Sequence, residues 1–149
     1  MKTAVCYYSR HHGNTRRVLE EMAQVGKMDL IEVTQSKTVD WEDYDCIGFA
    51  SGIYAFDFHK SVADFARKYL PKNKSVFFVC TYGIFQGNGS KTLQAIAREK
   101  GCRILGTFCC KGYDTFGPFR LIGGIAKGRP DRSDLEKAQN FYTKILSMQ

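Results

Sequence analysis

The chain has 149 residues, a size that suits one domain with a full hydrophobic core, and no proline- or serine-rich stretch or charge block divides it. Its 22 lysine and arginine residues exceed its 15 aspartate and glutamate residues, and the net charge of +7 indicates acidic partners or an anionic surface. The first apolar run, of about six residues, is too short for a signal peptide or a membrane span, so we expect one cytoplasmic domain over residues 1–149 without a transmembrane segment.

Apolar, β-branched and aromatic runs alternate with helical periodicity along the whole chain. The runs predicted as strands are 3–8, 29–33, 46–51, 75–81 and 103–110. The stretches with one apolar helical face are 18–23, 58–70, 93–97 and 135–146, and 36–44 is expected to be a loop or a short helix. This alternation predicts an α/β fold, a doubly wound three-layer sandwich with a five-stranded parallel sheet in the order 2-1-3-4-5.

Ligands of such sheets bind beyond the carboxyl ends of the strands, where the strand order reverses. Residues 9–15 join the first strand to the first helix through a small polar turn. The first helical N–H groups lack intrahelical partners and the helix dipole adds positive charge, so an anion can bind there. Ser9, Asn14 and Thr15 can add hydrogen bonds, and Gly13 lets the backbone approach closely. The sequence therefore predicts a phosphate site.

Two further loops at the same edge, 51–56 and 81–89, are rich in glycine and aromatic residues. Aromatic side chains in such loops indicate a flat ligand, and a flavin ring fits that shape. Tyr54 is predicted to stack on one face of the ring, and Phe85 or Tyr82 to pack near the other. The main-chain groups expected to bond the ring edge are those of Thr81, Gly83 and Gly87.

Other phosphate chemistries lack their residues. The predicted ends of the first and third strands are not acidic, which excludes an aspartyl phosphate with its Mg²⁺. Gly13 is the only glycine of the first loop, so the dinucleotide fingerprint is missing. Segment 83–92 superficially resembles a nucleoside triphosphate loop, but Ser90 separates Gly89 from Lys91. The Gly-Lys pair that this motif requires is therefore missing.

The triplet Gly13-Asn14-Thr15 matches the end of the flavodoxin phosphate-loop pattern, Ser/Thr-x-Thr-Gly-Asn-Thr, and the chain resembles short-chain flavodoxins along nearly its whole length. The resemblance implies a flavodoxin-like fold, noncovalent FMN, and a monomer that carries electrons between redox partner proteins, without a catalytic side chain. The residues expected to bind FMN are Ser9, Arg10, His11, His12, Gly13, Asn14, Thr15, Ser51, Gly52, Ile53, Tyr54, Thr81, Tyr82, Gly83, Phe85 and Gly87.

A second branch of this resemblance stays open. Quinone-coupled protoporphyrinogen oxidases with a flavodoxin fold also have a longer loop, Ser-x-x-x-Gly-x-Thr, and an aromatic and histidine segment that looks like 54–59. Those oxidases carry a long basic insertion after the fourth strand, whereas 82–90 here runs almost at once into a helix. This favours an electron carrier over an FMN-dependent quinone-coupled oxidoreductase.

The remaining features predict structure more than chemistry. His11 and His12 either contact the phosphate or point into solvent, and His59 is expected to begin a helix. The six cysteines lie mostly in apolar runs without metal spacing, so we expect buried, reduced thiols, no metal site and no nucleic-acid partner. Segment 112–130 is expected to be a packed surface loop anchored by Phe116 and Phe119; the alternative is contact with the cofactor or a partner.

Overall fold

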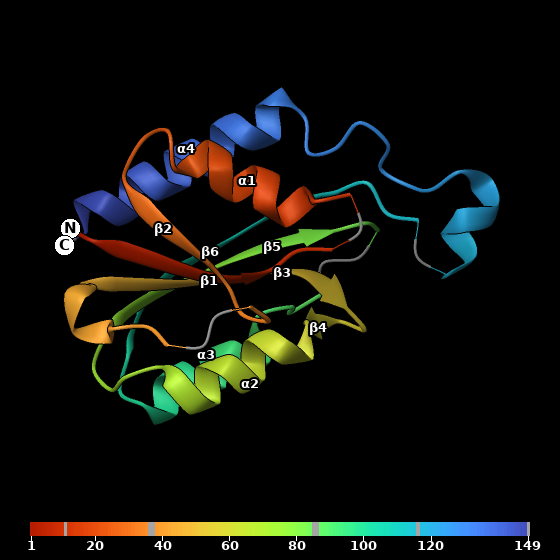
Figure 1. The fold of residues 1–149 in the computed structure, drawn as a ribbon. Helices are drawn as coiled ribbons and strands as arrows, with labels where there is room; N and C mark the ends of the chain where they lie inside the picture. Colours follow the sequence, from red (N-terminus) through yellow and green to blue (C-terminus); the bar gives the residue numbers. More distant parts are fainter. Residues whose placement is uncertain (11, 36–37, 85–86, 116, 149) are drawn as a thin grey trace.

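The computed structural model describes residues 1–10, 12–35, 38–84, 87–115 and 117–148, so the predictions for His11, Phe85 and Phe116 lie outside the described residues. Figure 1 shows a layered α/β structure. Its elements are β1 (Thr3–Tyr8), α1 (Asn14–Met22), β2 (Met28–Glu32), the 3₁₀ turn η1 (Trp41–Asp43), β3 (Cys46–Tyr54), β4 (Asp57–Phe58), α2 (Lys60–Tyr69), β5 (Ser75–Tyr82), α3 (Lys91–Glu99), β6 (Arg103–Lys111), the 3₁₀ turn η2 (Gly117–Ile122) and α4 (Arg132–Ser147).

The sheet confirms the predicted fold class. Five strands pair in parallel in the order β2-β1-β3-β5-β6, and the short β4 pairs antiparallel with β3 outside this path. Because β5 and β6 are the fourth and fifth parallel strands along the chain, the order is the expected 2-1-3-4-5. Helices α1 and α4 cover one face, and α2 and α3 cover the other (Figure 1).

Alternation along the buried strands builds a separate core on each face of the sheet. In β5, Phe77 and Val79 pack toward α1 and α4, whereas Val76 and Phe78 pack toward α2 and α3. Gly48 in β3 leaves room for the Phe77 ring, since a Cβ there would lie 2.6 Å from the ring's Cζ. Both layers are thereby fixed against the central strands, and the carboxyl ends of β1, β3 and β5 meet at one edge.

The third strand is longer than predicted. It continues through Tyr54 and turns into β4, so residues 51–54 belong to the sheet rather than to a loop. The turn is formed by Ala55 and Phe56, with φ of 48° and 71°. Such left-handed pairs are usually Asn-Gly or Asp-Gly, so Ala55-Phe56 carries no hairpin signal in the sequence.

The expectation that all six cysteines are reduced is wrong for two of them. Cys80 of β5 and Cys109 of β6 lie directly opposite each other and form a disulfide, with Cα atoms 4.5 Å apart. Sequence spacing could not reveal this pair because it depends on the register of two neighbouring strands. The four free cysteines are Cys6, Cys46, Cys102 and Cys110. Burial raises the pKa of Cys46 and of Cys110 to about 12, so these two thiols stay protonated at neutral pH.

Residues 112–130, which we call the arm, connect β6 to α4. The arm extends beyond the layered body at the carboxyl edge of the sheet, in cyan to light blue in Figure 1. Its base is closed by a hydrogen bond from the Tyr113 N–H to the Arg129 carbonyl over 2.9 Å and by a two-way backbone pairing of Asp114 with Ile125. No helix in the described part of the chain is long and apolar enough to cross a bilayer.

Candidate functional site

A cavity of about 230 Å³ opens at the carboxyl edge of the sheet, where the three predicted loops meet. Nine of the residues predicted to bind the ligand line it: Arg10, Asn14, Thr15, Gly52, Ile53, Tyr54, Thr81, Tyr82 and Gly83. Four further lining residues were not predicted: Ala55, Gly112, Tyr113 and Asp114. The site is therefore built from the ends of β1, β3, β5 and β6.

The start of α1 forms one end of this cavity. Its N-cap, Gly13, has φ of 66° and makes no side-chain capping bond, so the N-cap residue itself occupies none of the first-turn N–H groups that an anion could use. Ser9 accepts a hydrogen bond from the Arg16 N–H over 3.2 Å. Thr15 and Thr81 share a buried hydrogen bond of 3.0 Å between their hydroxyl groups, which ties α1 to the end of β5. This end has the donors that a phosphate group requires.

Aromatic rings and a carboxylate form the other walls. Tyr54 comes from the β3–β4 hairpin, and burial raises its pKa to about 12, so its hydroxyl stays protonated. Tyr82, the last residue of β5, and Tyr113 of the arm also line the cavity. Asp114 packs against Gly83, where a Cβ would lie 2.7 Å from its carboxylate Oδ2. The arm thus contributes both an aromatic and an acidic group to the cavity.

Five predicted residues in the described part of the chain do not line the cavity: Ser9, His12, Gly13, Ser51 and Gly87. His12 binds the arm instead, since its Nε2 lies 3.0 Å from the Thr115 hydroxyl and its ring centroid lies 4.3 Å from that of Tyr113. Ser51 is fully buried; its hydroxyl donates to the Gly52 carbonyl and accepts from the His59 N–H.

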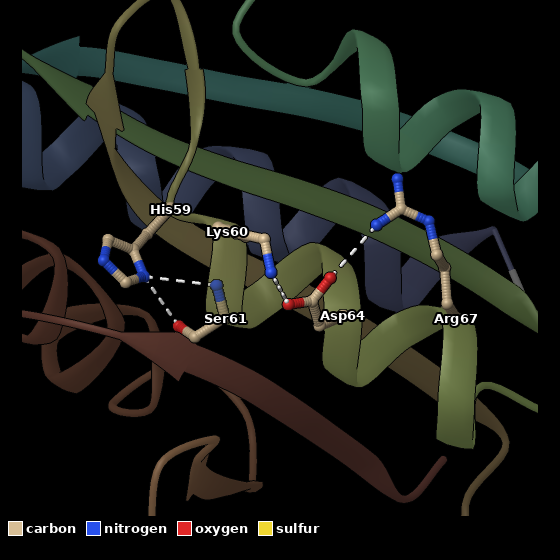
Figure 2. Close-up of polar contacts among 5 residues, drawn as sticks. All are labelled: His59, Lys60, Ser61, Asp64 and Arg67. Carbon is tan, nitrogen blue, oxygen red and sulfur yellow. Dashed lines mark hydrogen bonds and ion pairs between the residues drawn. The ribbon is translucent and has the colours of Figure 1, made fainter.

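His59 is the N-cap of α2, at the helix start as predicted, and packs against Tyr54 of the hairpin. Figure 2 shows its Nδ1 directed at the N–H and the hydroxyl of Ser61, 3.2 and 2.8 Å away. The ring stacks on Tyr8 with centroids 3.8 Å apart and meets the edge of Tyr54 at 5.0 Å. Burial lowers the pKa of His59 because the imidazolium form loses hydration. The same ring therefore supports the tyrosine that lines the cavity.

The family model described as "Flavodoxin domain" matches residues 4–101, about two thirds of the chain. The chain belongs to the flavodoxin family. An uncharacterised protein of Methanocaldococcus jannaschii is 38% identical over 98% of this chain and 99% of its own length. The matched residues run from β1 to the end of α3, so they include four of the five parallel strands and the loops that follow β1, β3 and β5; β6 and the arm lie outside the match.

Solved structures share the fold at low sequence identity. Oxidised flavodoxin 1 from Bacillus cereus is 16% identical, with a TM-score of 0.72 and coverage of 100% of this chain and 99% of that one. Fusobacterium nucleatum flavodoxin bound to flavin mononucleotide is 13% identical, with a TM-score of 0.69 and 99% of both chains covered. Rubredoxin oxygen:oxidoreductase from Desulfovibrio gigas is 16% identical, with a TM-score of 0.73. The match covers 99% of this chain but only 35% of that longer protein.

The arm residues were missed because the sequence contained no motif there. The sequence predicts a packed surface loop over 112–130, whereas the first residues of this segment line the cavity, which matches the alternative of contact at the ligand side. The glycines at 83 and 112 are the signal that could have been used: both permit close packing around the cavity, Gly112 against Asn14 and Gly83 against Asp114. Among the described residues, no group of three or more His, Cys, Asp or Glu side chains could hold a metal ion.

Proposed function

We propose that the cavity binds FMN noncovalently and that the protein carries electrons between redox partner proteins. The observation on which this rests is the meeting of a helix start, whose N-cap is a glycine, with an aromatic wall inside one cavity. The first suits a phosphate and the second suits a flat ring, and FMN contains both. The flavodoxin from F. nucleatum, whose fold this chain shares, is bound to flavin mononucleotide, which supports the same cofactor here.

The residues divide into two groups in this proposal. The N–H groups at the start of α1 hold the phosphate, and Arg10 lends positive charge from the cavity wall. The Asn14 amide is bonded to the Tyr113 carbonyl and the Thr15 hydroxyl to that of Thr81, so these two side chains fix the helix start in place. Tyr54 and Tyr82 pack on the ring, and the main chain near Gly52 and Gly83 bonds its edge. Because Ser51 and His12 are already bonded elsewhere, they act by holding the hairpin and the arm in place.

FMN supplies the redox chemistry when it is bound, and the protein sets how readily that chemistry occurs. The Asp114 carboxylate places negative charge in the cavity wall, which disfavours added electrons nearby and lowers the reduction potential of a group held there. The tyrosines exclude water from the ring faces. No side chain has to act as an acid, a base or a nucleophile for electrons to pass.

Charge supports the class of partner that we propose. The chain has a net charge of +7, so long-range attraction favours redox proteins with an acidic surface and slows the approach of basic ones. The cavity opens at the carboxyl edge, where exposed residues of the hairpin and the arm surround it. We therefore propose that acidic partners approach this edge of the molecule.

The test is a visible spectrum of the purified protein followed by stepwise anaerobic reduction. A carrier is expected to be yellow, to take up about one FMN per chain and to pass electrons to an acidic redox protein without turning over a small substrate. Rapid turnover with a quinone would instead support the oxidoreductase alternative. A protein that remains colourless and does not take up FMN would contradict both.

A further inference from the structure

The arm presents its most exposed apolar residues at η2. Leu121 is 89% exposed and Ile122 is 75% exposed, the highest values among the large apolar side chains of the described residues. Both lie in the part of the arm that extends from the layered body in Figure 1. Two adjacent aliphatic side chains on a projecting turn form an exposed apolar surface, and such surfaces mark sites of interaction with a protein or a membrane.

Hydrogen bonds hold this tip in shape. The Gly124 N–H donates to the Phe119 carbonyl over 2.7 Å, and the Tyr113 hydroxyl donates to the Gly123 carbonyl over 2.8 Å. The Tyr113 ring packs so closely under Gly124 that a Cβ there would lie 2.4 Å from it. The leucine and isoleucine are therefore displayed on a preformed turn, which lowers the entropy lost when they bind.

The surface around the tip is basic. Arg120 and Lys127 are exposed, and neither forms an ion pair among the described residues. The sequence between Asp114 and Asp131 contains no acidic residue. Because the whole chain has a net charge of +7, a second copy of it would be repelled from this surface. The occupant must therefore be anionic as well as apolar.

We propose that the arm docks the protein on an anionic lipid surface, with Leu121 and Ile122 inserted at the level of the acyl chains and Arg120 and Lys127 on the headgroups. Side chains that dominate protein interfaces are mainly Trp, Tyr and Arg, with leucine under-represented. Adjacent aliphatic residues on a convex tip flanked by cations fit a bilayer interface better. Ile84, 59% exposed next to the cavity, lies at the same edge of the sheet.

Co-sedimentation of the full-length protein with vesicles tests this docking directly and requires no flavin, so its outcome is independent of the proposed cofactor. We expect binding to vesicles of phosphatidylglycerol and phosphatidylcholine in equal parts, little binding to phosphatidylcholine alone, and weakening as salt is added. Leu121→Asp should weaken binding by about tenfold or more. Its matched control is Val25→Asp, which changes an exposed apolar residue at the opposite edge of the sheet and should bind like the wild type.

A charge pair completes the test. Arg120→Glu should weaken binding by about tenfold, whereas Lys72→Glu, an exposed residue between α2 and β5 at the opposite edge, should change it far less. The proposal is overturned if the wild type stays in solution with anionic vesicles, which would assign the tip to a protein partner. It is also overturned if Leu121→Asp binds as well as Val25→Asp, because net charge alone would then explain the binding.

Discussion

Asn14 donates a hydrogen bond from its Nδ2 to the main-chain carbonyl of Tyr113 over 2.8 Å. This bond joins the first turn of α1 to the base of the arm, 99 positions later in the sequence. Gly112 lies so close that a Cβ there would come within 2.6 Å of the Asn14 amide. The start of α1, which forms one end of the cavity, and the arm residues that form its wall therefore hold each other in place.

Asn14→Ala should loosen the arm. The substitution leaves the Tyr113 carbonyl without this donor and is expected to lower the free energy of unfolding by about 1 kcal/mol. Hydrogen exchange of the Tyr113 and Ile125 amides should become faster. The control is Asn140→Ala on the exposed side of α4, which gains the same helix propensity without losing this bond. Equal exchange rates in the two variants would show that the bond does not hold the arm.

His59 should make the stability depend on pH. Its pKa is lowered by burial in the folded protein, whereas the unfolded chain takes up a proton near pH 6.5. The free energy of unfolding should therefore be highest above about pH 6.5 and fall as the pH drops through the window toward the lower folded-state pKa. Urea unfolding between about pH 5 and 7.5 measures this slope. In His59→Asn, which keeps an acceptor at the helix start, the slope should shrink; an unchanged slope would assign it to other groups.

The β3–β4 turn should become more stable with glycine. Ala55 has φ of 48°. This left-handed conformation is unfavourable for any L-residue that carries a Cβ, whereas glycine adopts it freely. Ala55→Gly is expected to raise the free energy of unfolding by about 0.5–1 kcal/mol. Ala95→Gly, at an exposed position of α3, should instead lower it by about 1 kcal/mol. If thermal or urea unfolding shows both variants destabilised alike, the turn is not strained.

Asp134 should stabilise the start of α4 more than a surface carboxylate stabilises α2. It is 4% exposed and accepts two hydrogen bonds from Arg129, at 2.5 and 2.7 Å, and one from the Asp131 N–H. Asp134→Asn is expected to cost about 1–3 kcal/mol, less than for a fully buried pair because Arg129 is one-third exposed. Asp64, which pairs with Lys60 and Arg67 on an exposed face (Figure 2), provides the control: Asp64→Asn should change stability little.

The Arg129–Asp134 ion pair should also make the stability depend on pH in the acid range. The Arg129 guanidinium lowers the pKa of Asp134, so its contribution is complete above the ordinary carboxyl pKa and is lost as the pH falls through the lower folded-state value. Wild type and Asp134→Asn should therefore converge in stability when urea unfolding is measured in acid. A difference that persists unchanged at low pH would mean that packing, rather than charge, explains the loss.

Most of the fold could be predicted because apolar residues repeat along the sequence in a different pattern in strands and in helices. The first strand matches its predicted bounds, and the parallel order follows from strands that alternate with helices. The β3–β4 hairpin was missed because Ala55 and Phe56 occupy left-handed turn positions that usually hold glycine or asparagine. The Cys80–Cys109 pair was missed because it depends on the register between strands, which no local pattern encodes.

The candidate site was predictable where it follows strand ends. The residues after β1, β3 and β5 meet in the cavity because parallel strands bring their carboxyl ends to one edge. The arm could not be assigned in this way. Its contribution depends on tertiary contacts of His12, Asn14 and Gly83, and none of these has a fixed spacing to Tyr113 or Asp114.

The central claim is that the start of α1 holds the phosphate of FMN, and titration of the flavin-free protein with FMN, followed by flavin fluorescence, tests it most directly. Gly13 and Gly128 both have positive φ and both have nothing within 4 Å of an added Cβ, so aspartate at either position introduces the same strain and charge. We expect tight binding by the wild type and by Gly128→Asp, and a loss of about a hundredfold or more in Gly13→Asp, where the carboxylate would repel the phosphate. FMN binding that is equally strong in Gly13→Asp, or absent from the wild type, would contradict the account.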